Sequence, residues 1–255
     1  MKKLLLITLL LFPIGVFAQT NEEASISADR PGMATGTDIM PFMKIQWETG
    51  FESAYDGSPS FLMPTTMLRF GVTQFAEIRL EYDGTLNSLG NNGWEYEMAP
   101  IVVGTKVKIF DGYKWVPKTS LMANLSIPAK QSFDAAGSMQ HVAPSLYLLF
   151  QNDLTDWFNI GYNIGMEWSG YSHIHSTFLA MCLGFTISDN CGAFLESYNY
   201  FTNYGSDNHD VECNIDFGLT YTIHPRVQID LYGMFNCRNP NAFNGIGFGI
   251  AWLIN

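Results

Sequence analysis

Charged side chains recur at every second position in several stretches of this chain. In the stretch from 76 to 83, Glu77, Arg79, Glu81 and Asp83 alternate with apolar residues. A period of two places alternate side chains on one face of a β-strand, so these charges share a face. Carboxylates and cations gathered on one enclosed face can pair with one another, or can form a zone that selects solutes by charge.

Fifteen charged residues occupy such positions, and ten of them are acidic. They are Glu48, Glu52, Arg69, Glu77, Arg79, Glu81, Asp83, Lys106, Lys108, Glu167, Glu196, Glu212, Asp216, Arg226 and Asp230. We predict that they face the interior of a closed sheet as a polar network. A structural salt-bridge network is favoured over a selectivity zone, because charges between low-dielectric walls must be paired.

Catalytic and metal chemistry has weaker support. His173 and His175, followed by Ser176, are the one hint of an acyl-transfer site or of a weak metal site, and no third member stands out. We interpret both as loop histidines and predict no catalytic residue, no metal and no cofactor. The four cysteines form no C-x-x-C pair, and we favour free thiols, although Cys213 and Cys237 could be neighbours across a hairpin.

The elements that must position these charges are predicted by the same alternation. It indicates twelve strands, near 45–55, 64–73, 76–84, 99–110, 118–128, 141–151, 158–170, 175–187, 191–201, 210–222, 226–236 and 244–254. A helix would spread the charges around its axis, so helices are excluded in these stretches. The stretch 191–201 fits least well, because neither of its faces is cleanly apolar.

The beginning of the chain predicts export. Lys2 and Lys3 precede an apolar run and a small-residue cleavage site ending at Ala18, so residues 1–18 are expected to be a signal peptide. The whole chain is 47% hydrophobic and only 15% charged. Beyond the signal peptide it has no apolar run long enough for a spanning helix, and a closed barrel is the other structure that crosses a bilayer.

We therefore predict an all-β fold, an antiparallel up-and-down transmembrane β-barrel of about twelve strands, at 45–255. A soluble sandwich would also alternate, but it would not need so apolar an outer face. Residues 19–44 are expected to be an irregular lead-in, either in the periplasm or folded into the barrel mouth as a plug. Short connections alternate with longer ones, as in outer-membrane barrels, although 111–117 is long for an inner turn and 171–173 short for an outer loop.

Several motifs resemble a known family. They are Ala28-Asp29-Arg30-Pro31-Gly32, Ile45-Gln46-Trp47-Glu48-Thr49-Gly50, Leu68-Arg69-Phe70-Gly71-Val72-Thr73, Val103-Gly104-Thr105-Lys106-Val107, Asn163-Ile164-Gly165-Met166-Glu167-Trp168 and Gly192-Ala193-Phe194-Leu195-Glu196. In order and type they resemble the Bacteroidetes branch of the outer-membrane family named for the meta-pathway of phenol degradation. The resemblance implies a barrel in the outer membrane and a role in moving small apolar compounds. It brings no catalytic or ligand residues, and the end Trp252-Leu253-Ile254-Asn255 lacks the terminal aromatic residue common in such barrels.

The expected function is a passive outer-membrane pore or transporter for small solutes, with hydrophobic and aromatic ones among the candidates. The alternatives are a lipid-active outer-membrane enzyme that uses His173 and His175, and a structural or partner-binding protein. A net charge of -11 argues against nucleic acid as a partner. The expected partners are outer-membrane lipid and a small solute of unknown identity, and the oligomeric state stays open.

Overall fold

Thirteen strands account for most of the described chain. The computed structural model describes residues 25–55, 58–128, 141–170, 174–205, 209–237 and 244–254. The strands are β1 (Ile45–Tyr55), β2 (Pro59–Gly71), β3 (Ala76–Ser88), β4 (Trp94–Met98), β5 (Ile101–Tyr113), β6 (Val116–Ile127), β7 (Ala143–Thr155), β8 (Phe158–Trp168), β9 (His175–Ser188), β10 (Cys191–Asn203), β11 (His209–His224), β12 (Val227–Asn236) and β13 (Asn244–Leu253). Among the described residues, no helix has the length and hydrophobicity to span a bilayer.

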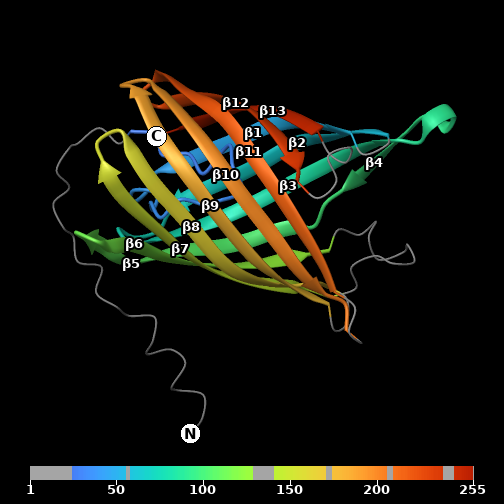
Figure 1. Cartoon of the computed structure of the whole chain (residues 1–255), viewed down its shortest axis with the longest axis horizontal. Helices are drawn as coiled ribbons and strands as arrows, with labels where there is room; N and C mark the ends of the chain where they lie inside the picture. The colour runs from blue at the N-terminus through green and yellow to red at the C-terminus, as the bar shows by residue number, and fades with distance from the viewer. Residues whose placement is uncertain are drawn as a thin grey trace, which may run out of the picture.

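Twelve of these strands form a closed antiparallel barrel (Figure 1). Consecutive barrel strands pair with one another, and the last strand, β13, pairs with β1, with Trp47 opposite Trp252. Closure gives every barrel strand two hydrogen-bonded neighbours, so the sheet has no free edge along the wall. The predicted twelve-stranded antiparallel barrel is confirmed.

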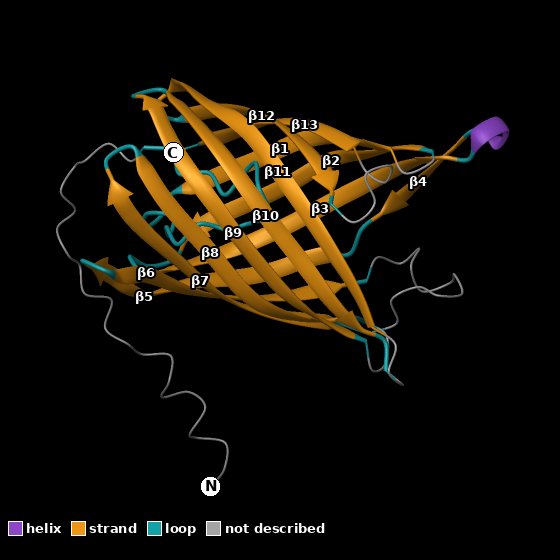
Figure 2. Cartoon of the chain, viewed as in Figure 1, coloured by secondary structure: helices purple, strands orange, loops and turns teal. Residues whose placement is uncertain are grey.

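The short strand β4 is an addition to the barrel that the sequence did not predict. It pairs with the last residues of β3, from Gly84 to Ser88, whereas β5 pairs with the first half of β3. A 3-10 turn, η2 (Gly90–Asn92), joins β3 to β4, and this hairpin projects beyond the barrel (Figure 2). The stretch predicted as a loop after residue 84 therefore contains strand structure, and only residues 89–93 form its tip.

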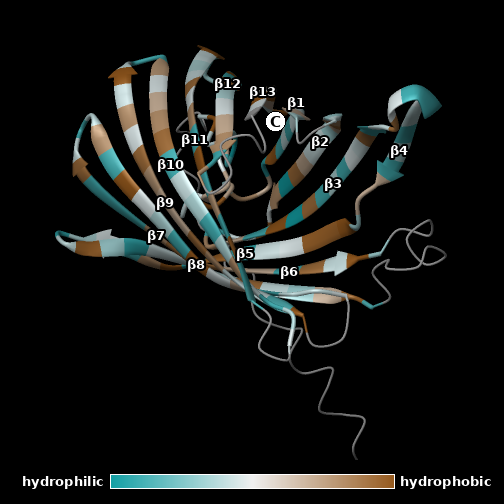
Figure 3. Ribbon diagram, turned by 45° about the vertical axis from the view of Figure 1, so that its right-hand side comes forward, coloured by the Kyte–Doolittle hydropathy of each residue, from teal (hydrophilic) through white to brown (hydrophobic). Residues whose placement is uncertain are grey.

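The two faces of the wall differ in chemistry. The apolar residues of β3, Ile78 and Leu80, are exposed on the outside, whereas Glu77 and Arg79 between them are buried inside. Bands of hydrophobic and hydrophilic residues alternate along the strands (Figure 3). This is the arrangement of a barrel whose outer face lies in lipid and whose inner face is polar.

The two ends of the barrel carry connections of different length. At one end, here the turn end, the strands meet in short turns such as 114–115, 156–157 and 225–226. The opposite, loop end carries the longer connections. The prediction of a long inner connection at 111–117 was wrong, because a register shift between Lys108 and Phe110 interrupts the alternation and conceals the last residues of β5.

The inner face of β10 shows why the alternation of its sequence was ambiguous. Glu196, Tyr198 and Tyr200 lie at alternate positions; Tyr198 is buried, and Tyr200 packs against it in a small aromatic cluster with Phe178 of β9. The inner face of β10 is therefore partly aromatic, while Leu195 and Phe201 are exposed on the outside. Large rings on both faces removed the contrast on which the sequence pattern depends.

Residues 25–44, here called the inserted segment, have no regular structure and run inside the barrel (Figure 1). The segment begins at the turn end, where the Ile26 amide donates to the Pro225 carbonyl. It returns there at Met43, whose amide donates to the Gly71 carbonyl. Between these points it forms a loop that enters the lumen from the turn end.

Candidate functional site

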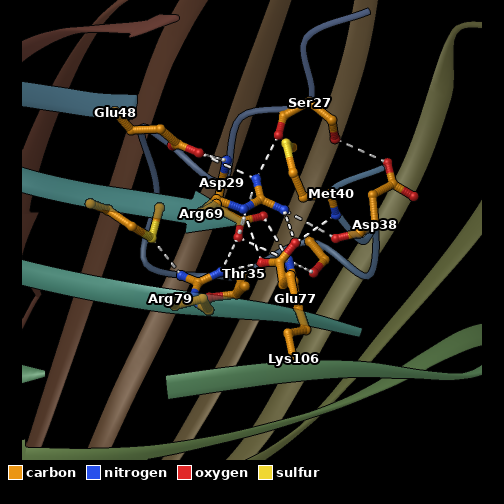
Figure 4. A network of polar contacts seen from close by, with 12 residues as sticks. Ser27, Asp29, Thr35, Asp38, Met40, Glu48, Arg69, Glu77, Arg79 and Lys106 are labelled. Atoms are coloured by element: carbon orange, nitrogen blue, oxygen red, sulfur yellow. Dashed lines mark hydrogen bonds and ion pairs between the residues drawn. The ribbon is translucent and has the colours of Figure 1, made fainter. Parts of the chain in front are cut away.

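Arg69 of β2 is the centre of a buried polar network that joins the wall to the inserted segment (Figure 4). Its guanidinium donates to both carboxylate oxygens of Glu77, each at 3.0 Å, and to Glu48 at 3.2 Å. It also donates to the backbone carbonyls of Ser27, at 2.6 Å, and Asp38, at 3.2 Å. One wall cation therefore binds the inserted segment both near its beginning, at Ser27, and near its end, at Asp38.

Asp29 is the counter-ion that the inserted segment brings to this network. Its carboxylate forms ion pairs with Arg79, with Lys106 at 2.9 Å and with Arg69 at 3.6 Å. Burial raises the pKa of Asp29, but the charges of Arg69, Lys106 and Arg79 outweigh burial and leave this pKa well below its usual value. Asp29 is therefore a permanent anion that holds three wall cations, which supports charge pairing as the principal role of this cluster.

Arg30 binds the inserted segment to the adjoining part of the wall, from β12 to β2. Its guanidinium pairs with Asp230 of β12 at 3.2 Å and donates to the Thr65 hydroxyl at 2.9 Å. The guanidinium lies against Gly50 and Gly249, where a Cβ atom at either position would come within 2.3 Å of Nη2. Glycine in β1 and β13 is thus required for the close approach of Arg30, since any side chain there would fill its place.

Residues 30–35, here called the tip of the inserted segment, are also held through their backbone by two further wall residues. The Glu196 carboxylate accepts hydrogen bonds from the amides of Met33, at 2.7 Å, and Ala34, at 3.0 Å. Asn163 of β8 accepts from the Thr35 amide at 2.8 Å and donates to the Thr35 carbonyl at 3.1 Å. The tip is therefore bound to β8, β10 and β12 as well as to the cation cluster of β2, β3 and β5.

The fifteen residues predicted to form the polar network are distributed over three environments. Eight are buried inside the barrel: Glu48, Arg69, Glu77, Arg79, Lys106, Glu196, Asp216 and Asp230. Four are partly buried on the inner face nearer the loop end: Glu52, Glu81, Asp83 and Glu167. The remaining three, Lys108, Glu212 and Arg226, lie near the barrel ends.

Arg226 is a correction to that prediction. It lies in the exposed turn between β11 and β12, not on a strand, because β12 begins one residue later than expected. Lys108 also takes no part in the central network, and pairs instead with Asp111 at 2.7 Å at the turn end. The register shift after Lys108 ends the alternation on which its placement was based.

Asp29 and Arg30 are the functional residues that the alternation could not identify. They lie on no strand, and period-two reasoning considers strands alone. A signal was present in the sequence, because adjacent charges of opposite sign precede a Pro-Gly pair in a segment with few other charges. Their contacts with residues up to 200 positions away depend on the closed barrel.

Two chambers lie on opposite sides of the inserted segment. The loop-side chamber has a volume of about 410 Å³ and is lined by residues such as Glu52, Tyr200 and Met234. The turn-side chamber has a volume of about 300 Å³ and is lined by small residues such as Gly161 and Gly192. Both chambers contact the same part of the inserted segment, namely Asp29, Arg30, Pro31, Gly32 and Thr35.

The other candidates for chemistry lie apart from these chambers. His173 lies outside the described residues, and His175 is half-buried at the start of β9. Cys213 and Cys237 lie opposite one another, with the Cys237 amide donating to the Cys213 carbonyl, and all four thiols are free. Within the described parts of the chain, no three His, Cys, Asp or Glu side chains gather as a possible metal site.

The sequence of the chain matches one family model. The match runs over residues 28–252 and therefore includes the inserted segment from Ala28 as well as the barrel, and the family is described as "Putative MetA-pathway of phenol degradation". The chain belongs to this family. Among curated proteins, none matches the chain. Placement in the Bacteroidetes branch of the phenol-degradation family stays a prediction.

Solved structures similar to this member of the phenol-degradation family are outer-membrane barrels. The COG4313 outer membrane channel from Pseudomonas putida F1 has 9% identity and a TM-score of 0.65, over 88% of this chain and 99% of that chain. The NanC porin has 11% identity and a TM-score of 0.57, over 82% of this chain and 98% of that one. The KdgM porin has 9% identity and a TM-score of 0.51, over 82% and 99%. At such identities the likeness establishes the barrel fold.

Proposed function

We propose that this protein is a passive outer-membrane channel for small solutes, and that the inserted segment sets the width of its path. The observation that carries the proposal is the pair of chambers on either side of the segment. Because both contact Asp29, Arg30, Pro31, Gly32 and Thr35, they are separated only by the tip of one loop. A solute entering at the loop end would pass this tip to reach the turn end, and no energy source would be needed.

The proposed location follows from the outer face of the wall. Large apolar residues such as Leu231, Phe248 and Ile250 are exposed there on neighbouring strands. A bilayer covers such a face, and charge on it is costly. The short turns would then lie in the periplasm, the loop end outside the cell, and the predicted signal peptide would direct export. The similar structures, which are a channel and two porins, support this proposal.

The narrowest part of the path would lie along the wall of β8 to β10, beside the points where Asn163 and Glu196 hold the tip of the segment. Gly161, Gly184 and Gly192 line the turn-side chamber on that wall and leave space there. On the other side of the lumen, the segment is bound tightly to Arg69, Arg79 and Lys106. The channel would therefore admit small solutes along one side of the inserted segment.

The direct test is the permeability of purified protein in lipid. We expect single-channel conductance in planar bilayers and swelling of proteoliposomes in small neutral solutes, with slower swelling as solute size increases. Empty liposomes and liposomes with protein denatured before reconstitution are the controls. Absence of both conductance and swelling over a range of solutes would refute the channel.

The proposal includes the absence of catalytic activity. The enzyme alternative depends on His173 and His175, so lipid hydrolysis and acyl transfer should be measured with the unmodified protein and with the double variant His173→Ala, His175→Ala. We expect no turnover above the lipid-only background in either sample. Turnover that the double variant loses would favour the lipid-active enzyme.

A further inference from the structure

The loop-side chamber has an imbalance of charge that the protein itself does not neutralise. Seven carboxylates line it. Those of Asp29, Glu48 and Glu81 pair with arginines, and four remain, from Glu52, Asp83, Glu167 and Asp216. Among the described residues, none of the four has a Lys, Arg or His nitrogen within 4 Å. The two arginines that line the chamber are already paired with other acids, Arg30 with Asp230, and Arg79 with Asp29, Glu77 and Glu81.

Three of these carboxylates have neutral donors. The Tyr232 hydroxyl donates to Glu52 at 3.2 Å, and the Tyr147 hydroxyl donates to Glu167 at 2.7 Å. Asp83 accepts from a backbone amide at 3.2 Å. These hydrogen bonds satisfy oxygen atoms without neutralising charge, so the chamber retains a field that attracts cations.

Asp216 differs from the other three because one of its carboxylate oxygens has no hydrogen-bond donor among the described residues. It is only 2% exposed, and its Oδ1 accepts no hydrogen bond from any described residue. Its register partner across β10 and β11 is Glu196, a second carboxylate that is already occupied by the amides of the inserted segment. The chamber has a second buried oxygen without a donor among the described residues, which is Oδ1 of Asn124. Buried acceptors without donors are costly, and a bound cation or N–H donor would relieve that cost.

The chamber also has an aromatic wall beside these acceptors. Phe178 lies between Tyr147, at 5.8 Å between ring centroids, and Tyr200, at 5.1 Å. Tyr198 packs edge-on against Tyr200 at 6.2 Å. Aromatic faces attract organic cations and pack well against apolar bodies. A volume of about 410 Å³ lies in the range of small-molecule sites.

We propose that the loop-side chamber binds an organic cation with an aromatic body, of the class of arylalkylammonium ions. Asp216 would face the ammonium group, and the rings of Tyr147, Phe178, Tyr198 and Tyr200 would pack on the body. This inference deepens the proposed channel function by naming a solute class, and rests on that function only for its transport role. An anion of the same shape would meet the four carboxylates and be excluded.

Binding is measured directly, so that the test does not depend on flux. Purified protein in detergent is titrated by calorimetry at pH 7 with benzylammonium, benzyl alcohol and benzoate, which share a body and differ in charge. We expect benzylammonium to bind at one site per chain, and the other two to bind at least about tenfold more weakly. Equal binding of benzyl alcohol and benzylammonium would overturn the proposal.

Variants separate the charge contact from the aromatic contact. Asp216→Asn keeps the shape and removes the charge, and we expect benzylammonium affinity to fall about tenfold or more. Tyr200→Leu should weaken binding, whereas Tyr200→Phe, which keeps the ring, should retain it. Glu95→Gln, an exposed acid of β4 outside the chamber, is the matched control and should bind as the unmodified protein does.

Each outcome bears on the inference separately from the channel. The heat-dependent electrophoretic shift typical of barrels verifies that each variant is folded, and the Tyr200 pair keeps the test valid if Asp216→Asn does not fold. Unchanged binding in folded Asp216→Asn, or conductance without benzylammonium binding, would overturn the inference alone. Charge-selective binding without conductance would support the binding site and refute the channel.

Discussion

At the scale of single residues, the chain uses one aspartate to satisfy three buried cations. Arg69, Arg79 and Lys106 come from three neighbouring barrel strands, and Asp29 reaches all of them from the inserted segment. Like charges so close on one wall would repel one another without a shared anion. Glu77 of β3 pairs with the same three cations, so the wall and the inserted segment both supply anions to this cluster.

The first prediction concerns the removal of this anion. Asp29→Asn removes one ion pair from each of three buried cations, so we expect the free energy of unfolding to fall by about 3 kcal/mol. Guanidinium titration of the protein in detergent, followed by tryptophan fluorescence, measures this loss. Asp111→Asn, which removes an exposed ion pair with Lys108, is the control and should cost about 1 kcal/mol or less. Equal losses in the two variants would contradict the assigned role of Asp29.

A second prediction follows from the pKa of Asp29. Because the pKa of Asp29 in the folded protein is lowered by Arg69, Lys106 and Arg79, its stabilisation is complete above its pKa in the unfolded chain, about 3.9. It is lost only as pH falls below that value toward the folded pKa. We expect the Asp29 contribution, measured as the stability difference between the unmodified protein and Asp29→Asn, to be constant from pH 5 to 8. A contribution that shrinks between pH 7 and 5 would contradict this assignment.

At the scale of elements, the inserted segment has no secondary structure and is positioned entirely by the strands around it. Its own backbone offers few internal hydrogen bonds, so the wall supplies partners for its amides and carbonyls, as Glu196, Asn163 and Arg69 show. Side-chain partners come from eight barrel strands, namely β1, β2, β3, β5, β6, β8, β10 and β12. A segment held in this way can be loosened one contact at a time without changing the barrel.

The third prediction tests this dependence at the tip. Arg30→Ala removes the contacts with Asp230 and Thr65, so the tip should move more freely and the mean conductance in planar bilayers should rise roughly twofold or more. Gly249→Ala, which would displace the Arg30 guanidinium, should act in the same direction. Arg226→Ala removes an exposed arginine in a turn and is the control. An unchanged conductance in Arg30→Ala would mean that the tip does not limit the path.

At the scale of the whole molecule, the barrel is inverted relative to a soluble protein. Its largest buried side chains include Arg69, Lys106, Glu48 and Glu77, whereas its exposed residues include many of its large apolar ones. Lipid outside and polar groups inside make this arrangement stable, since closure pairs the strands around the wall. The fold thereby encloses a buried polar network inside the barrel.

The fourth prediction tests the lipid-facing surface. Leu231 is exposed near the middle of β12, so Leu231→Arg should lower the free energy of unfolding in phospholipid vesicles by about 2–4 kcal/mol. Ile223→Arg, near the turn end of β11, is the matched control and should cost about 0–1 kcal/mol, because charge is tolerated near the interface. If both variants cost the same, the outer face does not lie in a bilayer at the proposed depth.

The sequence by itself determined the strands, their faces and the closed barrel. Side chains such as Ile78 and Glu77 alternate with a period of two, and this local property depends only on the geometry of an extended chain. It failed locally where that geometry is interrupted, at the register shift after Lys108, or where both faces carry rings, as in β10. Charge, composition and strand length supplied the remaining constraints.

Only the tertiary structure decided what the inner face contacts. Asp29 and Arg30 lie in an irregular segment with no period, and Arg30 meets Asp230 across 200 positions of sequence. How the closed wall curves around that loop decides which wall residues meet the segment. It also decides that Oδ1 of Asp216 has no hydrogen-bond donor among the described residues. Long-range pairing of this kind arises from the three-dimensional enclosure, and no local spacing along the chain encodes it.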